Sequence, residues 1–370
     1  MVTNRKKQFL IFLFVFFGVL FAFQIFAQEG FTAREVEATI TQMKSVEELA
    51  GGVRQYTFNA QTPYGEDLFV ETVDSFVAGV GFDLKVGDQV NLRLIDVDGG
   101  VEVYLDDVQR ETGIWWIIGF FVAITLGIGL LRGFLSLVGL AVTVVILVLG
   151  LFPAILSGTD PVFATVTASA IILGVNMHLS HGFKQQTFYA YISTLCGLGL
   201  VLVFTRVFLA VARLSGLASE EGALLFWELD PVQIPVGILA AGIILGAVGV
   251  LDDIAITQSE IVSELLLANP HVTRKELFTK AMRIGRHHIA SAVNTLILVY
   301  AGAALPAFLL FMNQFGGYQE FLQNEIVAEE VVRTLAGTCA LVLLVPLSTW
   351  FATLNPQVVD DGVDMAAKRA

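Results

Sequence analysis

Apolar segments of about twenty residues recur along this chain and constrain its fold more than any other feature. Each is near the ~20 residues that a helix needs to cross a bilayer. The mean hydropathy of +0.74 also belongs to a protein that crosses a membrane many times. The sequence therefore predicts a polytopic α-helical membrane bundle over residues 113–356, followed by a tail at 357–370. Its seven predicted spans are 114–131, 134–157, 161–180, 187–210, 235–256, 287–311 and 330–353.

The N-terminus carries three consecutive basic residues at positions 5–7, before an apolar run from Phe9 to Ala27. This pattern fits a cleaved signal peptide or an uncleaved anchor helix over residues 1–27, and both alternatives remain open. In either case the basic residues stay in the cytoplasm, so the chain emerges outside at residue 28.

The charges of the loops predict the same orientation. If the spans alternate from an outside start at residue 113, the inner loop at 265–286 holds five Lys or Arg. The outer loop at 211–234 then holds four Asp or Glu and a single Arg. Because basic loops stay inside, the C-terminus is predicted inside. Thr273 and Glu276 form a T-x-x-E capping box, which predicts a short amphipathic helix at about 273–285 on the inner surface; a simple basic connector is the alternative.

Residues 28–112 have a different pattern, with short alternating runs separated by turn signals such as Gly51–Gly52 and Asp98–Gly99–Gly100. Such runs predict a small extracytoplasmic all-β domain, an OB-like barrel of five or six strands. Residues 28–113 hold six Lys or Arg and seventeen Asp or Glu, a net charge of −11. That charge argues against nucleic acid as a partner. The domain is either a binding site for a protein partner or a passive folded cap.

No cofactor or metal is predicted. The chain has no P-loop, no Rossmann glycine pattern and no paired CxxC motif. His178 and His181 are spaced for one helix face, but no clear carboxylate or cysteine partner is near them in the sequence. Cys196 and Cys339 both lie in apolar segments, so no structural disulfide is expected.

One span ends in acidic residues and is the candidate functional element. Ionisable groups in a membrane helix are costly and therefore mark functional sites by default. At about 100° per residue, the helix at 235–264 has a single face of glycines followed by polar residues, and Asp252 and Gln258 lie off this face. The predicted ion or proton pathway on this helix nevertheless includes both of them, together with Asp253, Thr257 and Glu260. The glycines predict a groove for close helix packing that leads to Asp253; the alternative is that the acids only cap the helix. The face contains Gly242, Gly246, Gly249, Asp253, Thr257, Glu260 and Glu264.

Other polar residues within spans extend the predicted site. Asn294 and Thr295 lie in the sixth span, and Asn294 is placed to reach Asp253 from a neighbouring helix; a structural interhelical hydrogen bond is the alternative. Near the outer side, the predicted gate pairs Arg206 with Glu329 or Glu330. The alternative there is an intrahelical ion pair between Glu329 and Arg333, four residues apart.

Several strings in the chain resemble the YibE/F family of bacterial multi-pass membrane proteins. The resemblance covers nearly the whole chain after the first apolar run, and it implies a location in the bacterial cell membrane. The order of parts is also similar to half of an RND or SecDF-type permease, but here Asp253 lies nearer the cytoplasmic end. The strings are R-G-F-L-S-L-V-G-L at 132–140, H-G-F at 181–183, F-T-R at 204–206, G-V-L-D-D-I-A-I-T-Q at 249–258, H-I-A-S-A-V-N-T-L at 288–296, Y-A-G at 300–302, N-E-I-V-A-E-E-V-V-R-T-L at 324–335 and V-P-L-S-T at 345–349.

Two functions are compatible with these features. In the first, the protein is a secondary transporter or ion-coupled permease, in which Asp253 changes protonation or binds a cation and an unknown small solute or ion is moved. In the second, it is a non-transporting scaffold or assembly factor that binds a protein partner through the β domain. Enzyme activity is not expected, because Asp252 and Asp253 are adjacent and diverge, and no HExxH or GxSG motif is present.

Overall fold

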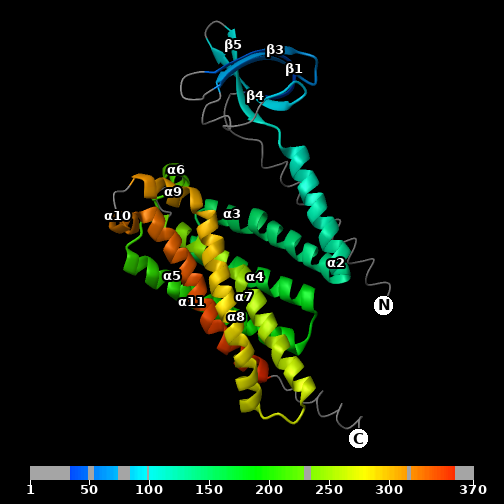
Figure 1. Cartoon of the computed structure of the whole chain (residues 1–370), viewed down its shortest axis with the longest axis vertical. Coiled ribbons are helices and arrows are strands. Elements are labelled where there is room, and N and C mark those ends of the chain that lie inside the picture. Colours follow the sequence, from blue (N-terminus) through cyan, green and yellow to red (C-terminus); the bar gives the residue numbers. More distant parts are fainter. Residues whose placement is uncertain are drawn as a thin grey trace. The chain divides into compact units, whose positions relative to one another are not determined.

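The chain forms two compact units, which divide at Leu130 and have separate hydrophobic cores. The structure is a computed structural model (Figure 1). The run at 9–27 and the tail at 357–370 lie outside the described residues. The residues described are 34–48, 54–73, 84–97, 100–228, 235–314 and 318–354.

The first unit contains a five-stranded antiparallel sheet in the spatial order β3–β2–β1–β4–β5. The long strand β1 pairs with β4 through its first residues and with β2 through the rest, and register shifts interrupt the second pairing. The edge strands β3 and β5 also contact each other, so the sheet curls into a half-barrel. The strands are β1 (Arg34–Glu48), β2 (Arg54–Gln61), β3 (Asp67–Val73), β4 (Gln89–Val97) and β5 (Gly100–Val108).

The predicted strand periodicity is confirmed in the core of this sheet. In β2 the side chains of Tyr56, Phe58 and Ala60 are buried and the residues between them are not, because successive side chains of a strand point to opposite faces. Phe58 is fully buried in the same cluster as Ile40 of β1 and Leu92 of β4. The half-barrel therefore has its own apolar core.

The second unit is helical. Helix α2 begins in the first unit and is broken at Leu130, whose φ of 48° and ψ of −127° are not helical. The helices are α2 (Glu111–Val145), the π-helix η1 (Ile146–Leu151), α3 (Phe152–Leu156), α4 (Pro161–His181), α5 (Gln185–Ala212), α6 (Glu220–Glu228), α7 (Pro235–Ala268), α8 (Arg274–Ala303), α9 (Leu305–Gln314), α10 (Tyr318–Gln323) and α11 (Glu325–Thr353).

Five stretches of helix in the described chain are long and apolar enough to cross a membrane: Glu111–Leu156, α4, α5, α7 and α11. Helices α8 and α9, bent by 65° where they meet, make a sixth if they are counted as one span. The protein is therefore a multi-helix membrane protein.

The inner connector differs from the prediction. The separate helix expected at 273–285 and the span expected from 287 form one continuous helix, α8. Thr273 does cap the start of this helix, since its hydroxyl accepts from the backbone N–H of Glu276 at 3.3 Å, while the Glu276 carboxylate forms an ion pair with Lys280 at 2.8 Å. The break comes later, at Ala304, because Pro306 cannot donate a backbone hydrogen bond and its ring clashes with the preceding turn.

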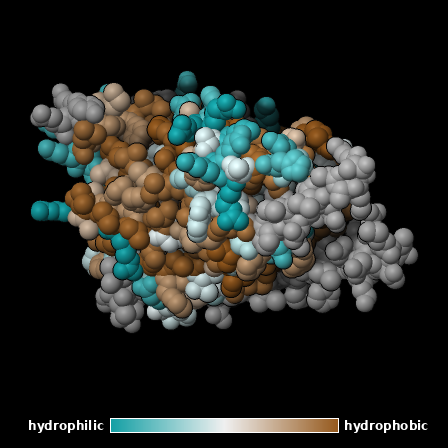
Figure 2. All heavy atoms as spheres, turned by 90° about the horizontal axis from the view of Figure 1, so that it is seen from below, coloured by the Kyte–Doolittle hydropathy of each residue, from teal (hydrophilic) through white to brown (hydrophobic). Residues whose placement is uncertain are grey.

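Helix α7 packs against α4, α5, α8 and α11 and forms the centre of the bundle, and Figure 1 shows the long helices α5, α7, α8 and α11 running alongside one another. Ile243, Ile244 and Leu251 of α7 are fully buried in the main apolar cluster, together with Leu344 of α11. Figure 2 shows the end of the molecule that carries the α7–α8 loop, where hydrophilic side chains gather in one area beside hydrophobic ones.

Two glycines of α8 make a matched test of this packing. A Cβ at Gly285 would lie 2.8 Å from Cγ1 of Val345 and 3.0 Å from Oε1 of Gln258, whereas a Cβ at Gly302 would meet nothing within 4 Å. We expect Gly285→Ala to destabilise the bundle by about 1–3 kcal/mol through overpacking. Gly302→Ala should be neutral or stabilising, because alanine favours a helix over glycine.

The measurement is the thermal unfolding midpoint of each purified variant in detergent. Equal midpoints for the two variants would contradict the close approach of α8 to α7 and α11.

Candidate functional site

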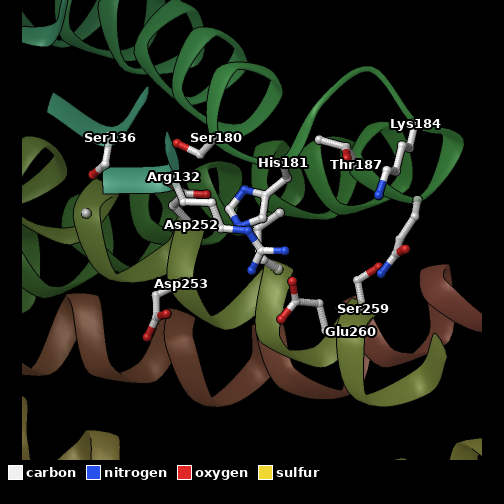
Figure 3. A pocket seen from close by; sticks show the side chains of 13 residues that line it. Arg132, Ser136, Ser180, His181, Lys184, Thr187, Asp252, Asp253, Ser259 and Glu260 are labelled. Carbon is white, nitrogen blue, oxygen red and sulfur yellow. The ribbon is translucent and has the colours of Figure 1, made fainter. Parts of the chain in front are cut away.

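The two adjacent carboxylates of α7 lie in different environments. Asp252 is half-buried and Asp253 is exposed. Consecutive residues of a helix point about 100° apart, and Figure 3 shows the Asp253 carboxylate turned away from Arg132 and His181. The two carboxylates therefore differ in burial and direction, although both line the same cavity.

A cavity of about 510 Å³ lies beside Asp252. Its walls come from α2 after the break, the end of α4, the start of α5 and the middle of α7. The cavity therefore combines opposite charges contributed by several elements (Figure 3). Its charged lining residues are Arg132, His181, Lys184, Asp252, Asp253 and Glu260.

Asp252 is the least satisfied of these charged groups. Its Oδ1 atom is buried and has no hydrogen-bond partner among the residues that the structure describes. His181, the last residue of α4, is close enough to act on the Asp252 charge electrostatically. A buried polar atom without a partner is costly, so this oxygen is available for a proton, a cation or a water molecule.

The short turn between α4 and α5 brings two basic residues to the cavity. Gly182 has a φ of 83°, which is disfavoured for other residues, and its N–H donates to the His178 carbonyl at 2.9 Å. The turn lies between His181 and Lys184, and both residues line the cavity. Sequence reasoning did not assign these residues to the site. The available signal was that His181 and Lys184 lie at the predicted inner end of one span. Arg132 lies at the predicted inner end of another.

Gln258, predicted for the same pathway as Asp253, points instead into the protein. It is fully buried, and its Oε1 lies 3.0 Å from the Thr349 hydroxyl of α11, whose single proton is shared between this oxygen and the Val345 carbonyl at 2.7 Å. Its Nε2 has no partner within the described part of the chain. Ser259 is also buried with an unpartnered hydroxyl, but it lines the cavity. Thr257 is half-buried, and the exposed Glu260 lines the cavity.

The glycine face of α7 receives side chains from two neighbours. A Cβ at Gly242 would lie 3.4 Å from a guanidinium nitrogen of Arg333, and one at Gly246 would lie 3.0 Å from the Tyr300 hydroxyl. Gly249 has no atom within 4 Å of its added Cβ and lines the cavity. The groove thus accommodates α11 and α8 at one end and opens to the cavity at the other.

The predicted residues of α8 are not brought to the cavity. Asn294 and Thr295 are both exposed, and the Thr295 hydroxyl donates to the Ser291 carbonyl of its own helix at 3.0 Å. Within the residues placed by the structure, no hydrogen bond joins Asn294 to Asp253.

The residues of the predicted outer gate are also separated. Arg206 is exposed and lines a second cavity with Arg213 and Asp160. Glu329 is buried, while Glu330 forms an ion pair with Arg333 at 3.3 Å, three residues away on α11. Over residues 100–228, 235–314 and 318–354, no ion pair joins Arg206 to either glutamate, and the expected Glu329–Arg333 pair is replaced by Glu330–Arg333.

The fold and the cavity define a class of protein: a helical membrane bundle with an N-terminal β half-barrel and a cavity of mixed charge on its central helix. The chain belongs to the YibE/F family, since the sequence model of the YibE/F-like protein matches residues 117–356, more than half of the chain. The match covers the helical part and begins after the sheet. No curated protein and no solved structure matches the chain.

The contact between Gln258 and Thr349 gives a stability prediction. Thr349→Val would remove the hydroxyl and leave the whole buried amide of Gln258 unpaired. We expect a loss of about 1–3 kcal/mol, above the ~0.6 kcal/mol average for an interhelical hydrogen bond in a membrane. Thr338→Val is the matched control on α11. The buried Thr338 hydroxyl donates to the Thr334 carbonyl of its own helix, as Thr349 does to the Val345 carbonyl, but among the described residues it has no partner on another helix. Thermal unfolding in detergent that ranks the two variants equally would refute a specific role for the pair.

Proposed function

We propose that this YibE/F-family protein is an ion-coupled membrane transporter that uses the carboxylate of Asp252 to exchange a proton or hold a cation. The observation that carries the proposal is the buried, unpartnered Oδ1 of Asp252 at the wall of a cavity of about 510 Å³. Ionisable residues in membrane helices that face a cavity mark ion pathways. The transported solute is a small ion or molecule, and no reaction is catalysed.

The surrounding charges give the carboxylate two states. When Asp252 is ionised, Arg132, His181 and Lys184 are the basic groups lining the same cavity that can balance it. When Asp252 is protonated or holds a cation, its negative charge no longer attracts these basic groups. Because Asp252 lies on α7, which packs against four helices, the change acts on the contacts at the centre of the bundle.

The proposed topology has seven spans, with the β domain outside and the C-terminus inside the bacterial cell membrane. The stretch Glu111–Leu156 has 46 residues, about twice the ~20 that cross a bilayer, and its break at Leu130 divides it into two spans. Basic residues at the α7–α8 connection, and Arg132 by itself at the break in α2, support this orientation.

The β domain is proposed to be an OB-like barrel. A β1–β2–β3 meander extended by β4 and β5, with β3 touching β5, is a five-stranded, partly open arrangement of that kind. A second candidate function, binding of a protein partner by this domain, is favoured by two aromatic side chains. Phe69 and Tyr104 are about half-exposed on the edge strands β3 and β5, and aromatic residues commonly anchor interfaces.

Single-cysteine labelling tests the topology. In a chain whose free cysteines Cys196 and Cys339 are replaced by alanine, one cysteine is placed at Tyr64, Ser157 or Lys275, which are all exposed. We expect a membrane-impermeant maleimide to label positions 64 and 157 on intact cells, and position 275 only after permeabilisation. Labelling of 64 and 275 with protection of 157 would mean that residues 111–156 cross the membrane once. Labelling of 275 with protection of both 64 and 157 would reverse the orientation.

The adjacent aspartates provide a matched test of transport. We expect Asp252→Asn to reduce proton flux in proteoliposomes under an imposed pH gradient to the level of protein-free liposomes. Asparagine keeps the size of the side chain and removes its titratable charge. Asp253→Asn should keep most of the flux, because that carboxylate is exposed and turned away from the basic residues.

Loss of flux in Asp253→Asn alone would assign the exchange to the other carboxylate. No flux in the folded wild-type protein would reject proton coupling and leave partner binding as the better explanation.

A further inference from the structure

A second cavity, of about 720 Å³, lies at the other end of α7. It is formed by the starts of α4 and α7 and the end of α5. Ala240 of this cavity and Asp252 of the first are twelve residues apart on α7, or about 18 Å along the helix. The two cavities are therefore separate sites.

Arginine dominates the charge of this second cavity. Its charged lining residues are Arg206, Arg213 and Asp160. The Asp160 carboxylate already accepts from the backbone N–H of Phe163 at 2.7 Å, where it caps the start of α4. Neither arginine forms an ion pair with any residue that the structure describes. Arg206 is exposed and lies six residues before the end of an apolar span, close enough for its guanidinium to extend toward the membrane interface.

The backbone at Arg213 adds an independent observation. This residue ends α5 in the left-handed conformation, with a φ of 53°. Glycine is the usual residue at such a position, since a side chain is disfavoured there. The chain nevertheless carries an arginine, and it lines the cavity. Strained residues of this kind cluster at ligand sites.

We propose that this cavity binds a phosphate group through Arg206 and Arg213. Guanidinium groups recognise phosphate oxygens with paired, charge-assisted hydrogen bonds. The N-terminal ends of α4 and α7 at the same cavity add positive partial charge.

The remaining walls of the cavity are largely apolar, including Val162, Leu209 and Val236. A phosphate carried on a lipid fits such walls as well as free phosphate does, and the two sources share the same recognition chemistry. The site does not depend on transport through the Asp252 cavity.

The experiment measures the thermal unfolding midpoint of the full-length protein in lipid-free detergent against two probes. One is inorganic phosphate, compared with chloride at equal ionic strength. The other is dioctanoyl phosphatidylglycerol. We expect at least one probe to raise the midpoint, by mass action on the folded state. A response to inorganic phosphate identifies free phosphate as sufficient, and a response to the lipid alone identifies a headgroup.

Two variants and one control decide the assignment. Arg213→Gly relieves the left-handed strain and should fold at least as well as wild type. It should nevertheless raise the half-saturating probe concentration about tenfold or more, as expected for losing a charged hydrogen bond. Arg206→Gln should weaken binding similarly. Arg274→Gln, which changes an exposed arginine at the start of α8, should bind as wild type does. The proposal is overturned if neither probe acts on wild type, or if both cavity variants respond as wild type does.

Discussion

Close packing around α7 is the constraint on which the rest of the helical unit depends. This helix contacts α4, α5, α8 and α11, and small residues make the approach possible. A Cβ on Gly197 of α5 would lie 3.3 Å from Cδ2 of Leu251, and one on Gly285 of α8 would meet Gln258. Because the neighbours are this close, each face of α7 has a fixed environment, and the position of a polar residue around the helix decides what it can do.

Asp252, Asp253 and Gln258 illustrate this dependence. Asp252 is half-buried in the lining of a cavity with basic groups, Asp253 is exposed in the lining of the same cavity, and Gln258 is enclosed between α8 and α11. The three side chains lie within seven residues of one helix. Their different surroundings follow from which neighbour covers each face, and only the carboxylate with an unpartnered buried oxygen is suited to exchange an ion.

Local patterns predicted the elements better than the site. Alternation predicted the strands, and long apolar runs predicted the long apolar helices, because each depends on one segment only. The break expected before His287 did not occur, since charged residues lower hydropathy without interrupting a helix. Helical periodicity placed Asp253 on the glycine face. Periodicity does not show which neighbouring helix covers each face, so it could not show that Asp252 is the more buried carboxylate. The positions of α2 and the α4–α5 turn, which bring Arg132, His181 and Lys184 to Asp252, depend on tertiary packing.

The two cavities also define what transport through this bundle would require. Both border α5 and α7, but the segment of α7 between them carries Ile243, Ile244 and Leu251, which are fully buried in the apolar cluster. A packed interior of this kind leaves no channel for a hydrated ion. Passage would therefore need whole helices to shift. Such a shift would disrupt the fewest packing contacts along the glycine face of α7. There a Cβ at Gly246 would meet one side chain, that of Tyr300, and a Cβ at Gly249 would meet no atom within 4 Å.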